Sequence, residues 1–317
     1  MSDTEAADDA GGALGPVLIT GANGNLGRAL IRRLTRGAAP RRTVRALVRS
    51  ERAAAAIRAL PETDVVLVDY ADEDALARAA SGCDVIVHLV GILKESSTTR
   101  YSDAHEGSAE ALSAAARRTR CLRVVYVSIL GAHVESSNAC LASKARAENI
   151  LLAPPLETTV LRVPMVIGGD EPATRALRAR TQARFVPLVR GGRSLEQPID
   201  ADDVVEAIAA TLVRPGLAGR VLDLAGPESL PRRELIRRAA ALARAGSPRF
   251  VPIPLAIARA VAGLAARFAA DPPVTPAMLG VLEHDDCVDP APACRALGIE
   301  LTPLDETLRR VLTGPDA

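Results

Sequence analysis

Short apolar runs alternate with amphipathic stretches along the first two thirds of the chain. The apolar runs occupy residues 17–19, 44–48, 65–68, 85–87, 124–127, 159–161 and 220–224. Stretches with helical spacing cover 26–34, a segment ending near 76, 106–118, 144–152 and 202–212. This alternation predicts an α/β fold, in which helices cover both faces of a doubly wound parallel sheet.

A glycine-rich turn follows the first of these runs and opens the first helix. Residues 20–27 read TGANGNLG. Glycines at such positions allow a tight turn, a close approach of backbone N–H groups to a pyrophosphate, and close helix–strand packing. The helix N-terminus adds unsatisfied N–H groups and a positive dipole end. The segment therefore predicts a Rossmann-like dinucleotide site, whose phosphate-binding residues are Gly21, Asn23, Gly24, Asn25, Leu26, Gly27 and Arg28.

Composition along the chain predicts three parts. Residues 1–15 are small and acidic, unlike a signal peptide, and we expect a disordered tail. Residues 16–230 are expected to form the NAD(P)-binding Rossmann domain, with an excursion at 170–198 toward the substrate side. Residues 231–317 are expected to form a smaller, mainly helical subdomain that contacts substrate or partner.

The stretch 253–270 is the most membrane-like part of the sequence. Its large apolar residues recur at three- and four-residue spacing, at Ile257, Val261, Leu264 and Phe268. It is short for a bilayer span of about 20 apolar residues and contains Arg259 and Arg267. We interpret it as a helix packed within the C-terminal subdomain, with an interfacial membrane helix as the alternative.

The end of the second strand bears on which nicotinamide cofactor binds. NAD-preferring sites place an acid about 20 residues past the glycine loop, where it accepts from the ribose hydroxyls. Arg49 stands there, and a guanidinium suits a 2′-phosphate, with Arg28 close by in sequence. NADP(H) is therefore favoured. NAD(H) stays the alternative, because Glu51 is a competing acid and Arg49 could be solvated.

The loop resembles the T-G-x-x-G-x-x-G loop of the short-chain dehydrogenase/reductase superfamily. That resemblance implies that Asp69, after the third strand, approaches the adenine ring. It also implies that the chain after the fourth strand lies along the cofactor. The further cofactor contacts that it suggests are Tyr70, Leu89, Val90, Gly91, Lys144 and Pro164. His88 finishes a buried strand, and we interpret it as a packed residue.

In that superfamily a Tyr transfers the proton, and a Lys four residues later binds the nicotinamide ribose. The resemblance makes Lys144 this lysine and Ser128 the residue that orients a substrate carbonyl. Lys144 is one of only two lysines among 39 basic residues. Cys140 stands where the Tyr is expected, and Lys144 one turn away is expected to favour its thiolate. The missing phenol puts ordinary carbonyl reduction in doubt.

Later segments narrow the resemblance to atypical members of the superfamily. The stretches at 87–93, 127–132, 143–145, 161–164, 197–204 and 224–228 resemble the NADPH-binding accessory subunit of respiratory complex I and its bacterial epimerase-like relatives. Two functions follow. One is a structural, assembly or regulatory NADP(H)-binding protein, with a membrane complex or a quinone-related partner. The other is an oxidoreductase or epimerase, acting on a small or isoprenoid carbonyl substrate through Lys144 and Ser128.

Charge and composition exclude several classes. The net charge of +1 and an aromatic content of 2% argue against a nucleic-acid partner. The five cysteines are odd in number and contain no C-x-x-C pair, so neither a disulfide framework nor a metal site is predicted. We expect a cytoplasmic protein without a transmembrane segment, with peripheral membrane attachment as the alternative.

Overall fold

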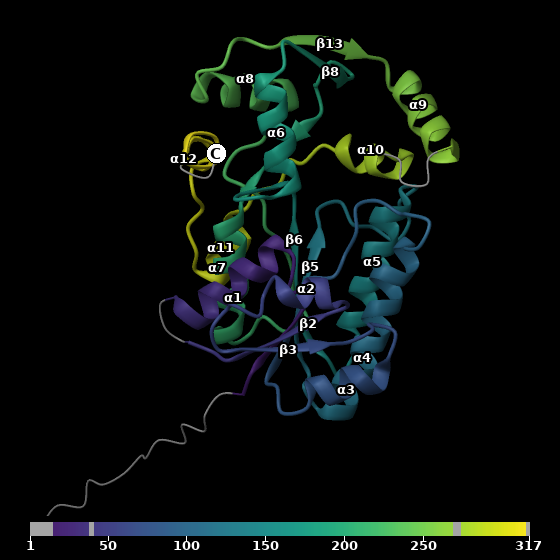
Figure 1. Cartoon of the computed structure of the whole chain (residues 1–317), viewed down its shortest axis with the longest axis vertical. Coiled ribbons are helices and arrows are strands. Elements are labelled where there is room, and N and C mark those ends of the chain that lie inside the picture. Colours follow the sequence, from purple (N-terminus) through teal and green to yellow (C-terminus); the bar gives the residue numbers. More distant parts are fainter. Residues whose placement is uncertain (1–14, 38–40, 269–273, 315–317) are drawn as a thin grey trace, which may run out of the picture.

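A computed structural model describes residues 15–37, 41–268 and 274–314. The predicted tail, 1–15, lies outside these ranges except for Gly15. Seven parallel strands form one sheet in the order β3-β2-β1-β4-β5-β6-β11 (Figure 1). Their bounds are β1 Val17–Thr20, β2 Val44–Val48, β3 Thr63–Leu67, β4 Val85–His88, β5 Arg123–Ile129, β6 Glu157–Val163 and β11 Val221–Asp223. The predicted fold class and all seven expected strands are confirmed.

Helices cover both faces of this sheet. One apolar core joins it to α1 (Asn25–Arg36), α2 (Glu51–Ala55), α7 (Ala201–Val213) and α11 (Ala291–Leu297), and a second joins it to α3 (Glu73–Ala80), α4 (Ser108–Thr119) and α5 (Ala139–Leu152). Alternate residues of one strand reach opposite cores: Val17 and Ile19 face the first, and Leu18 faces the second. Burial on both sides explains why the strands are nearly continuous aliphatic runs.

A smaller layer lies beyond the carboxyl ends of the strands (Figure 1). Its strand pairs are β7 (Val166–Ile167) with β10 (Ile199–Asp200), β8 (Phe185–Val189) with β13 (Arg249–Ile253), and β9 (Leu195–Glu196) with β12 (Leu230–Pro231). A third apolar core joins them to α6 (Pro172–Gln182), α8 (Arg232–Leu242) and α12 (Leu304–Thr313). The sequence analysis missed these strands, because they are short and proline interrupts three of them.

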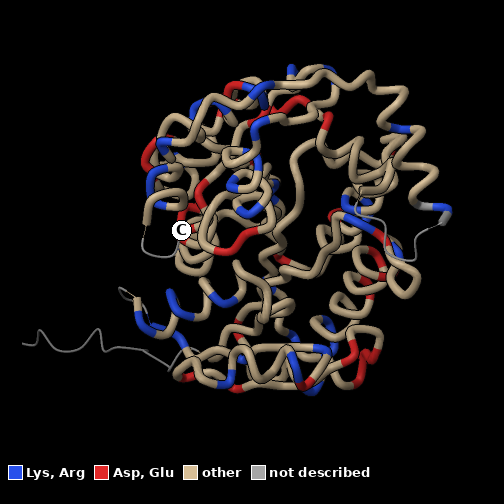
Figure 2. Tube along the Cα trace, turned by 45° about the horizontal axis from the view of Figure 1, so that its top comes forward, with Lys and Arg blue, Asp and Glu red and all other residues tan. Residues whose placement is uncertain are grey.

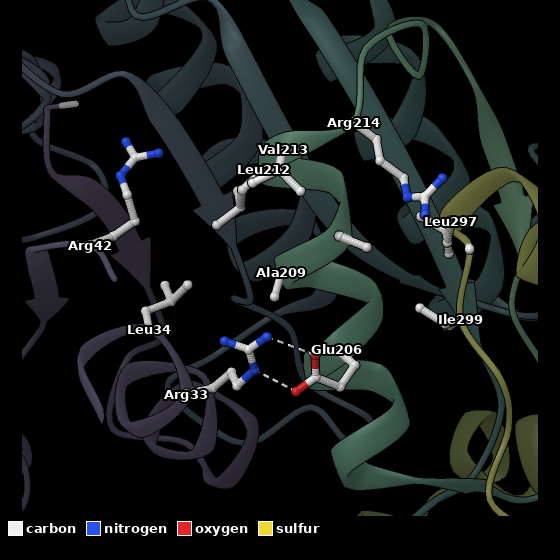
Figure 3. A pocket seen from close by; sticks show the side chains of 12 residues that line it. Arg33, Leu34, Arg42, Glu206, Ala209, Leu212, Val213, Arg214, Leu297 and Ile299 are labelled. Atoms are coloured by element: carbon white, nitrogen blue, oxygen red, sulfur yellow. Dashed lines mark hydrogen bonds and ion pairs between the residues drawn. The ribbon is translucent and has the colours of Figure 1, made fainter. Parts of the chain in front are cut away.

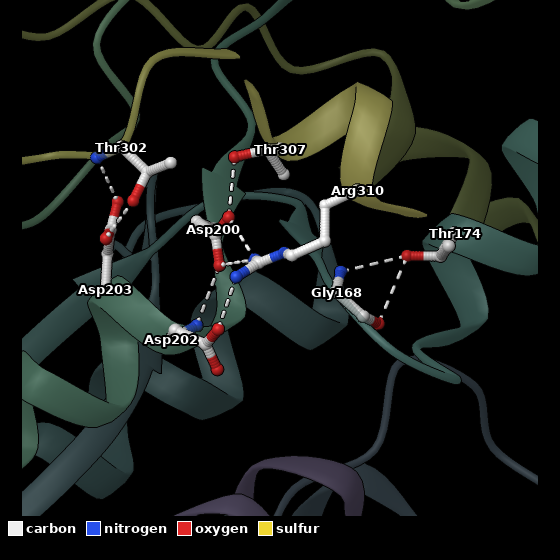
Figure 4. Close-up of polar contacts among 8 residues, drawn as sticks. All are labelled: Gly168, Thr174, Asp200, Asp202, Asp203, Thr302, Thr307 and Arg310. Atoms are coloured by element: carbon white, nitrogen blue, oxygen red, sulfur yellow. Dashed lines mark hydrogen bonds and ion pairs between the residues drawn. The ribbon is translucent and has the colours of Figure 1, made fainter. Parts of the chain in front are cut away.

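Buried acids at the start of α7 hold the last helix in place (Figure 4). Asp200 accepts a bond of 2.9 Å from the backbone of Asp202 and one of 2.6 Å from the hydroxyl of Thr307, and it pairs with Arg310. Asp203 accepts two bonds from Thr302. The acidic motif at 200–203 is thus an anchor for α12 in this structure.

The helix expected within 253–270 forms as α9 (Leu255–Phe268) and packs against α10, but its large apolar residues do not make this contact. Ile257, Val261 and Leu264 are all exposed, whereas Ala262 on another side of the helix is buried. The side chain of Phe268 lies outside the described residues. Helical spacing predicted the stripe, but the side of α9 that contains Ala262, rather than the large aliphatics, faces the protein. No helix in the described ranges is long and apolar enough to cross a membrane.

Candidate functional site

The site lies where the strand order reverses, between β1 and β4. Open α/β sheets bind ligands in the crevice outside such carboxyl ends. Gly21 has a φ of +67°, and a Cβ added there would lie 3.2 Å from the backbone carbon of Leu89. A Cβ on Gly27 would lie 2.6 Å from the oxygen of Ala22. The glycines therefore allow close backbone approaches, as the sequence predicted.

The N-terminus of α1 is open to an anion. Gly24 caps the helix without a side-chain bond, and its first turn contains no acid. The hydroxyl of Tyr70 accepts from the backbone N–H of Gly21 and donates to the oxygen of Leu47, both at 2.8 Å. Tyr70 thereby ties the glycine loop to the end of β2. The guanidinium of Arg49 lies 6.0 Å from the centre of the Tyr70 ring.

The excursion reaches back to this loop. Asn25 donates to the oxygen of Asp170 over 2.9 Å and accepts from Arg28 over 2.6 Å. The buried Nε of Arg28 has no partner among the described residues. Glu171 bonds Asn25, and burial raises the pKa of its carboxyl, opposed by Asn25, Arg175 and Arg28. Glu171 could not be predicted from the sequence, because its position near the loop depends on a contact between distant segments.

Lys144 lies at the centre of the second half of the site. It follows the N-cap Asn138 of α5 by six residues and is only 8% exposed. Its Nζ donates to the oxygen of Val127 over 3.2 Å and lies 4.6 Å from the centre of the Tyr126 ring. Burial lowers the pKa of Lys144 to about 8. A Cβ on Gly91 would lie 2.8 Å from this Nζ, so the chain after β4 passes close to the ammonium group.

Several buried polar atoms near Lys144 have no partner among the described residues. They are the hydroxyls of Tyr126 and Ser128 and the Nδ1 of His105. Tyr126 and Ser128 are two apart on β5 and therefore point to the same face. Buried polar groups are normally hydrogen-bonded, and those without partners require an explanation. A cofactor and a substrate in the crevice would supply such partners, so these residues fit a nicotinamide site.

Cys140 occupies the position expected for the Tyr, but it is not a poised nucleophile. Its side chain is fully buried, and its Sγ lies 3.7 Å from the oxygen of Ile92. Burial raises the pKa of the thiol to about 11, although Lys144 opposes this. Lys144 favours the thiolate, as expected, but burial has the larger effect, and the thiol is therefore neutral at ordinary pH.

His88 is packed, as the sequence analysis interpreted it. It is 1% exposed, its Nδ1 lies 2.7 Å from the hydroxyl of Thr20, and its ring stacks on Tyr126. Burial lowers its pKa to about 3. His88 therefore fills the core under the site as a neutral ring.

A second histidine, which the sequence analysis missed, lies against the loop after β5. A Cβ on Gly131 would lie 2.5 Å from the Nε2 of His284, whose Nδ1 is 3.1 Å from Asp286. Asp286 raises the pKa of His284. Just before it, α10 (Pro276–Leu282) packs on the start of α5, where Asn138 donates to the oxygen of Ala277 over 2.8 Å. The C-terminal segment thus contacts the loop that follows β5, just after Ser128.

A separate cavity of about 220 Å³ lies between α1 and α7 (Figure 3). An ion pair between Arg33 and Glu206 crosses it. Arg42 also lines the cavity and directly precedes β2 in the chain. The cavity is therefore near the amino-terminal ends of the strands, opposite the candidate site. It contains none of the predicted site residues.

Comparisons with known proteins identify the family. A family model described as NAD(P)H-binding matches residues 21–215. The chain belongs to the NAD(P)H-binding, atypical short-chain dehydrogenases/reductases. This confirms the resemblance drawn from the sequence.

Two relatives illustrate the range of this atypical dehydrogenase/reductase family. A mitochondrial NADH dehydrogenase [ubiquinone] 1 alpha subcomplex subunit 9 from Arabidopsis thaliana is 30% identical, over 77% of this chain and 61% of that protein. The chain thus spans about three fifths of that relative's length. A ceramide reductase from Caulobacter vibrioides is 30% identical, over 76% of this chain and 74% of that protein.

Solved structures show the shared fold. A triphenylmethane reductase from Citrobacter sp., complexed with NADP(H), has a TM-score of 0.72 at 19% identity, covering 93% of this chain and 100% of that chain. The UDP-glucuronic acid 4-epimerase from Bacillus cereus, in complex with UDP-glucuronic acid and NAD, has a TM-score of 0.72 at 16% identity. The match covers 94% of this chain and 98% of that chain.

Proposed function

We propose that this atypical dehydrogenase/reductase holds NADP(H) as a structural or regulatory cofactor and does not perform ordinary carbonyl reduction. The observation that supports this is the state of Cys140. It replaces the proton-donating phenol, is fully buried, and has a thiol pKa of about 11. Lys144, which would bind the nicotinamide ribose, is retained and free of any ion pair among the described residues.

The residues that would hold the cofactor span the crevice. The glycine loop and the open N-terminus of α1 would bind the pyrophosphate. The segment 89–91 and Pro164 would flank the nicotinamide half, and Asp69 the adenine. When bound, the reduced nicotinamide can supply a hydride. A carbonyl reduction would also need a proton at the oxygen, and Cys140 is poorly suited to provide it.

The preference for NADP(H) rests on Arg49 and Glu51. Arg49 is exposed at the end of β2, beside Tyr70. Glu51, the competing acid, accepts a bond of 2.6 Å from Arg58, seven residues further along the chain. This pairing supports the 2′-phosphate interpretation, because it gives the carboxylate a cationic partner of its own.

Titration with NADPH and NADH tests this proposal. We expect NADPH to bind at least about tenfold more tightly, a difference of about 1.4 kcal/mol. Arg49→Ala should remove the preference, whereas Arg52→Ala, another exposed arginine nearby, should keep it. Lys144→Ala should weaken both cofactors. Equal affinities in the unmodified protein would contradict the assignment.

A second candidate function is NADPH-dependent reduction of a lipophilic carbonyl compound. It is favoured by the unpartnered hydroxyl of Ser128 and by His284, whose pairing with Asp286 gives it a raised pKa near the same loop. The hydride would pass to the carbonyl carbon, and His284 would give its proton to the oxygen. The likeness to a ceramide reductase also supports this candidate.

NADPH oxidation with a panel of quinones and long-chain ketones separates the two functions. The reductase would be established if the protein oxidises NADPH with one of these compounds and if His284→Gln and Lys144→Ala abolish this turnover. The variant His133→Gln should keep it. His133 is a suitable control because it lies exposed on the same loop. No turnover across the panel, with tight NADPH binding intact, is the outcome expected for the structural role.

A further inference from the structure

The helix α9 presents its large apolar residues to solvent. Ile257, Val261 and Leu264 are 55%, 62% and 62% exposed. Their spacing of four and three residues places them on one side of the helix, which we call the α9 stripe. In a helix that serves only to fill a core, such residues face inward. Packing among the described residues therefore does not explain the α9 stripe.

The surroundings of the stripe are cationic. α9 itself contains no Asp or Glu and two arginines, Arg259 and Arg267. Both are exposed, and neither forms an ion pair within the described ranges. Figure 2 shows blue, basic segments along α9, which lies at the edge of the molecule. An occupant of this surface must therefore tolerate or carry negative charge.

A small apolar stripe among unpaired arginines fits a lipid surface better than a protein. A protein interface of standard size buries about 800 Å² on each partner, far more than three aliphatic side chains provide. An interfacial helix needs only an apolar face that enters the boundary between headgroups and acyl chains, with cations beside the headgroups. We propose that α9 docks on an anionic membrane surface through Ile257, Val261 and Leu264.

Such docking would place the candidate site next to the membrane. α9 packs against α10, and α10 lies on the start of α5 next to Cys140. The docking surface itself stands independently of the proposed function, because none of its residues belongs to the cofactor crevice.

Vesicle co-sedimentation of the full chain tests the proposal. We expect binding to phosphatidylcholine vesicles with about 30 mol % phosphatidylglycerol, weaker binding to pure phosphatidylcholine, and a loss at high salt. The triple variant Ile257→Ser, Val261→Ser, Leu264→Ser should bind at least about tenfold more weakly. Its matched control changes exposed apolar residues elsewhere, Leu67, Val213 and Val221, to Ser and should bind like the unmodified protein.

A fluorescence measurement locates the contact. The chain contains no tryptophan, so Val261→Trp and, separately, Val213→Trp each introduce a single reporter at an exposed position. Anionic vesicles should shift the emission of the first to the blue and leave the second unchanged. Three results would overturn the proposal: no pelleting with anionic vesicles, equal losses in the two triple variants, or self-association through the stripe without vesicle binding. NADPH affinity measured on the same samples confirms that each variant is folded.

Discussion

Two tyrosine hydroxyls in the site differ in their hydrogen bonding. The hydroxyl of Tyr70 has two backbone partners, whereas that of Tyr126 is buried with none among the described residues. The first tightens the glycine loop before any ligand binds. The second belongs to the group of polar atoms around Lys144 that a ligand would complete. The glycine loop is thus already held by hydrogen bonds, whereas the polar atoms around Lys144, at the other end of the crevice, still lack partners among the described residues.

Replacing the Tyr70 hydroxyl should therefore weaken cofactor binding. Tyr70→Phe keeps the ring beside Arg49 but removes both bonds, leaving the N–H of Gly21 without its anchor. We expect NADPH affinity to fall about tenfold, or about 1.4 kcal/mol. The control Thr35→Val also deletes a buried hydroxyl bond, to Ile31 on α1, and should leave NADPH affinity unchanged. Equal effects of the two changes would show that only general stability was lost.

The pairing of His284 with Asp286 predicts a pH dependence. Because Asp286 raises the pKa of His284, the pair stabilises the fold most below the unfolded value of about 6.5, and this is lost as pH rises through the higher folded value. Nuclear magnetic resonance should find His284 titrating above 6.5, and Asp286→Asn should lower that pKa. The signal is assigned by its absence in His284→Gln. A pKa unaffected by Asp286→Asn would refute the pairing.

Which site residues could be predicted from the sequence depended on whether they belong to a local sequence pattern. Gly21, Gly27 and Lys144 could be predicted as candidates, because each belongs to a local strand–turn–helix unit with characteristic spacing. Glu171 and His284 were missed, because each reaches the site through a contact between segments more than a hundred residues apart. Burial also cannot be read from the local sequence, and its effect on the thiol pKa of Cys140 outweighs the expected effect of Lys144.

Among the elements, the parallel strands were predictable and the short pairs were not. The five inner strands of the sheet are largely buried on both faces, which leaves aliphatic runs in the sequence. β8 contains Pro187 and β13 contains Pro252, and only their pairing makes them strands. For α9 the predicted helical period was right, but the apolar face points to solvent and not to the protein. Periodicity shows which residues share a face of a helix, but not what that face contacts.

The junction between β1 and α1 can be tested with one glycine. Gly24→Val should leave the circular dichroism spectrum native-like, because Gly24 is exposed and its φ of −64° suits any residue. The added methyls should obstruct the pyrophosphate, and NADPH binding should disappear. Gly246→Val, in open space after α8, is the matched control and should bind normally. Retained binding in Gly24→Val would remove the loop from its assigned role.

At the scale of the whole molecule, the last helix ties the two layers together. α12 belongs to the third apolar core, through Leu304, Leu308 and Val311. Its polar side reaches the start of α7 through Thr307 and Arg310 (Figure 4). The end of the chain therefore links the small layer to a helix of the Rossmann sheet, across more than a hundred residues of sequence.

This link predicts a large difference between two adjacent arginines. Arg310 pairs with Asp200, whose side chain is fully buried, so Arg310→Ala leaves a carboxylate that has lost its cationic partner. Arg309 pairs at 3.7 Å with the exposed Asp305 and should matter little. We expect Arg310→Ala to lower the free energy of unfolding by about 2 kcal/mol, less than a fully enclosed pair because the guanidinium is half exposed. Arg309→Ala should lower it by less than about 0.5 kcal/mol. Denaturant unfolding of both variants measures the difference, and equal losses would show that the Asp200 pair does not join the layers.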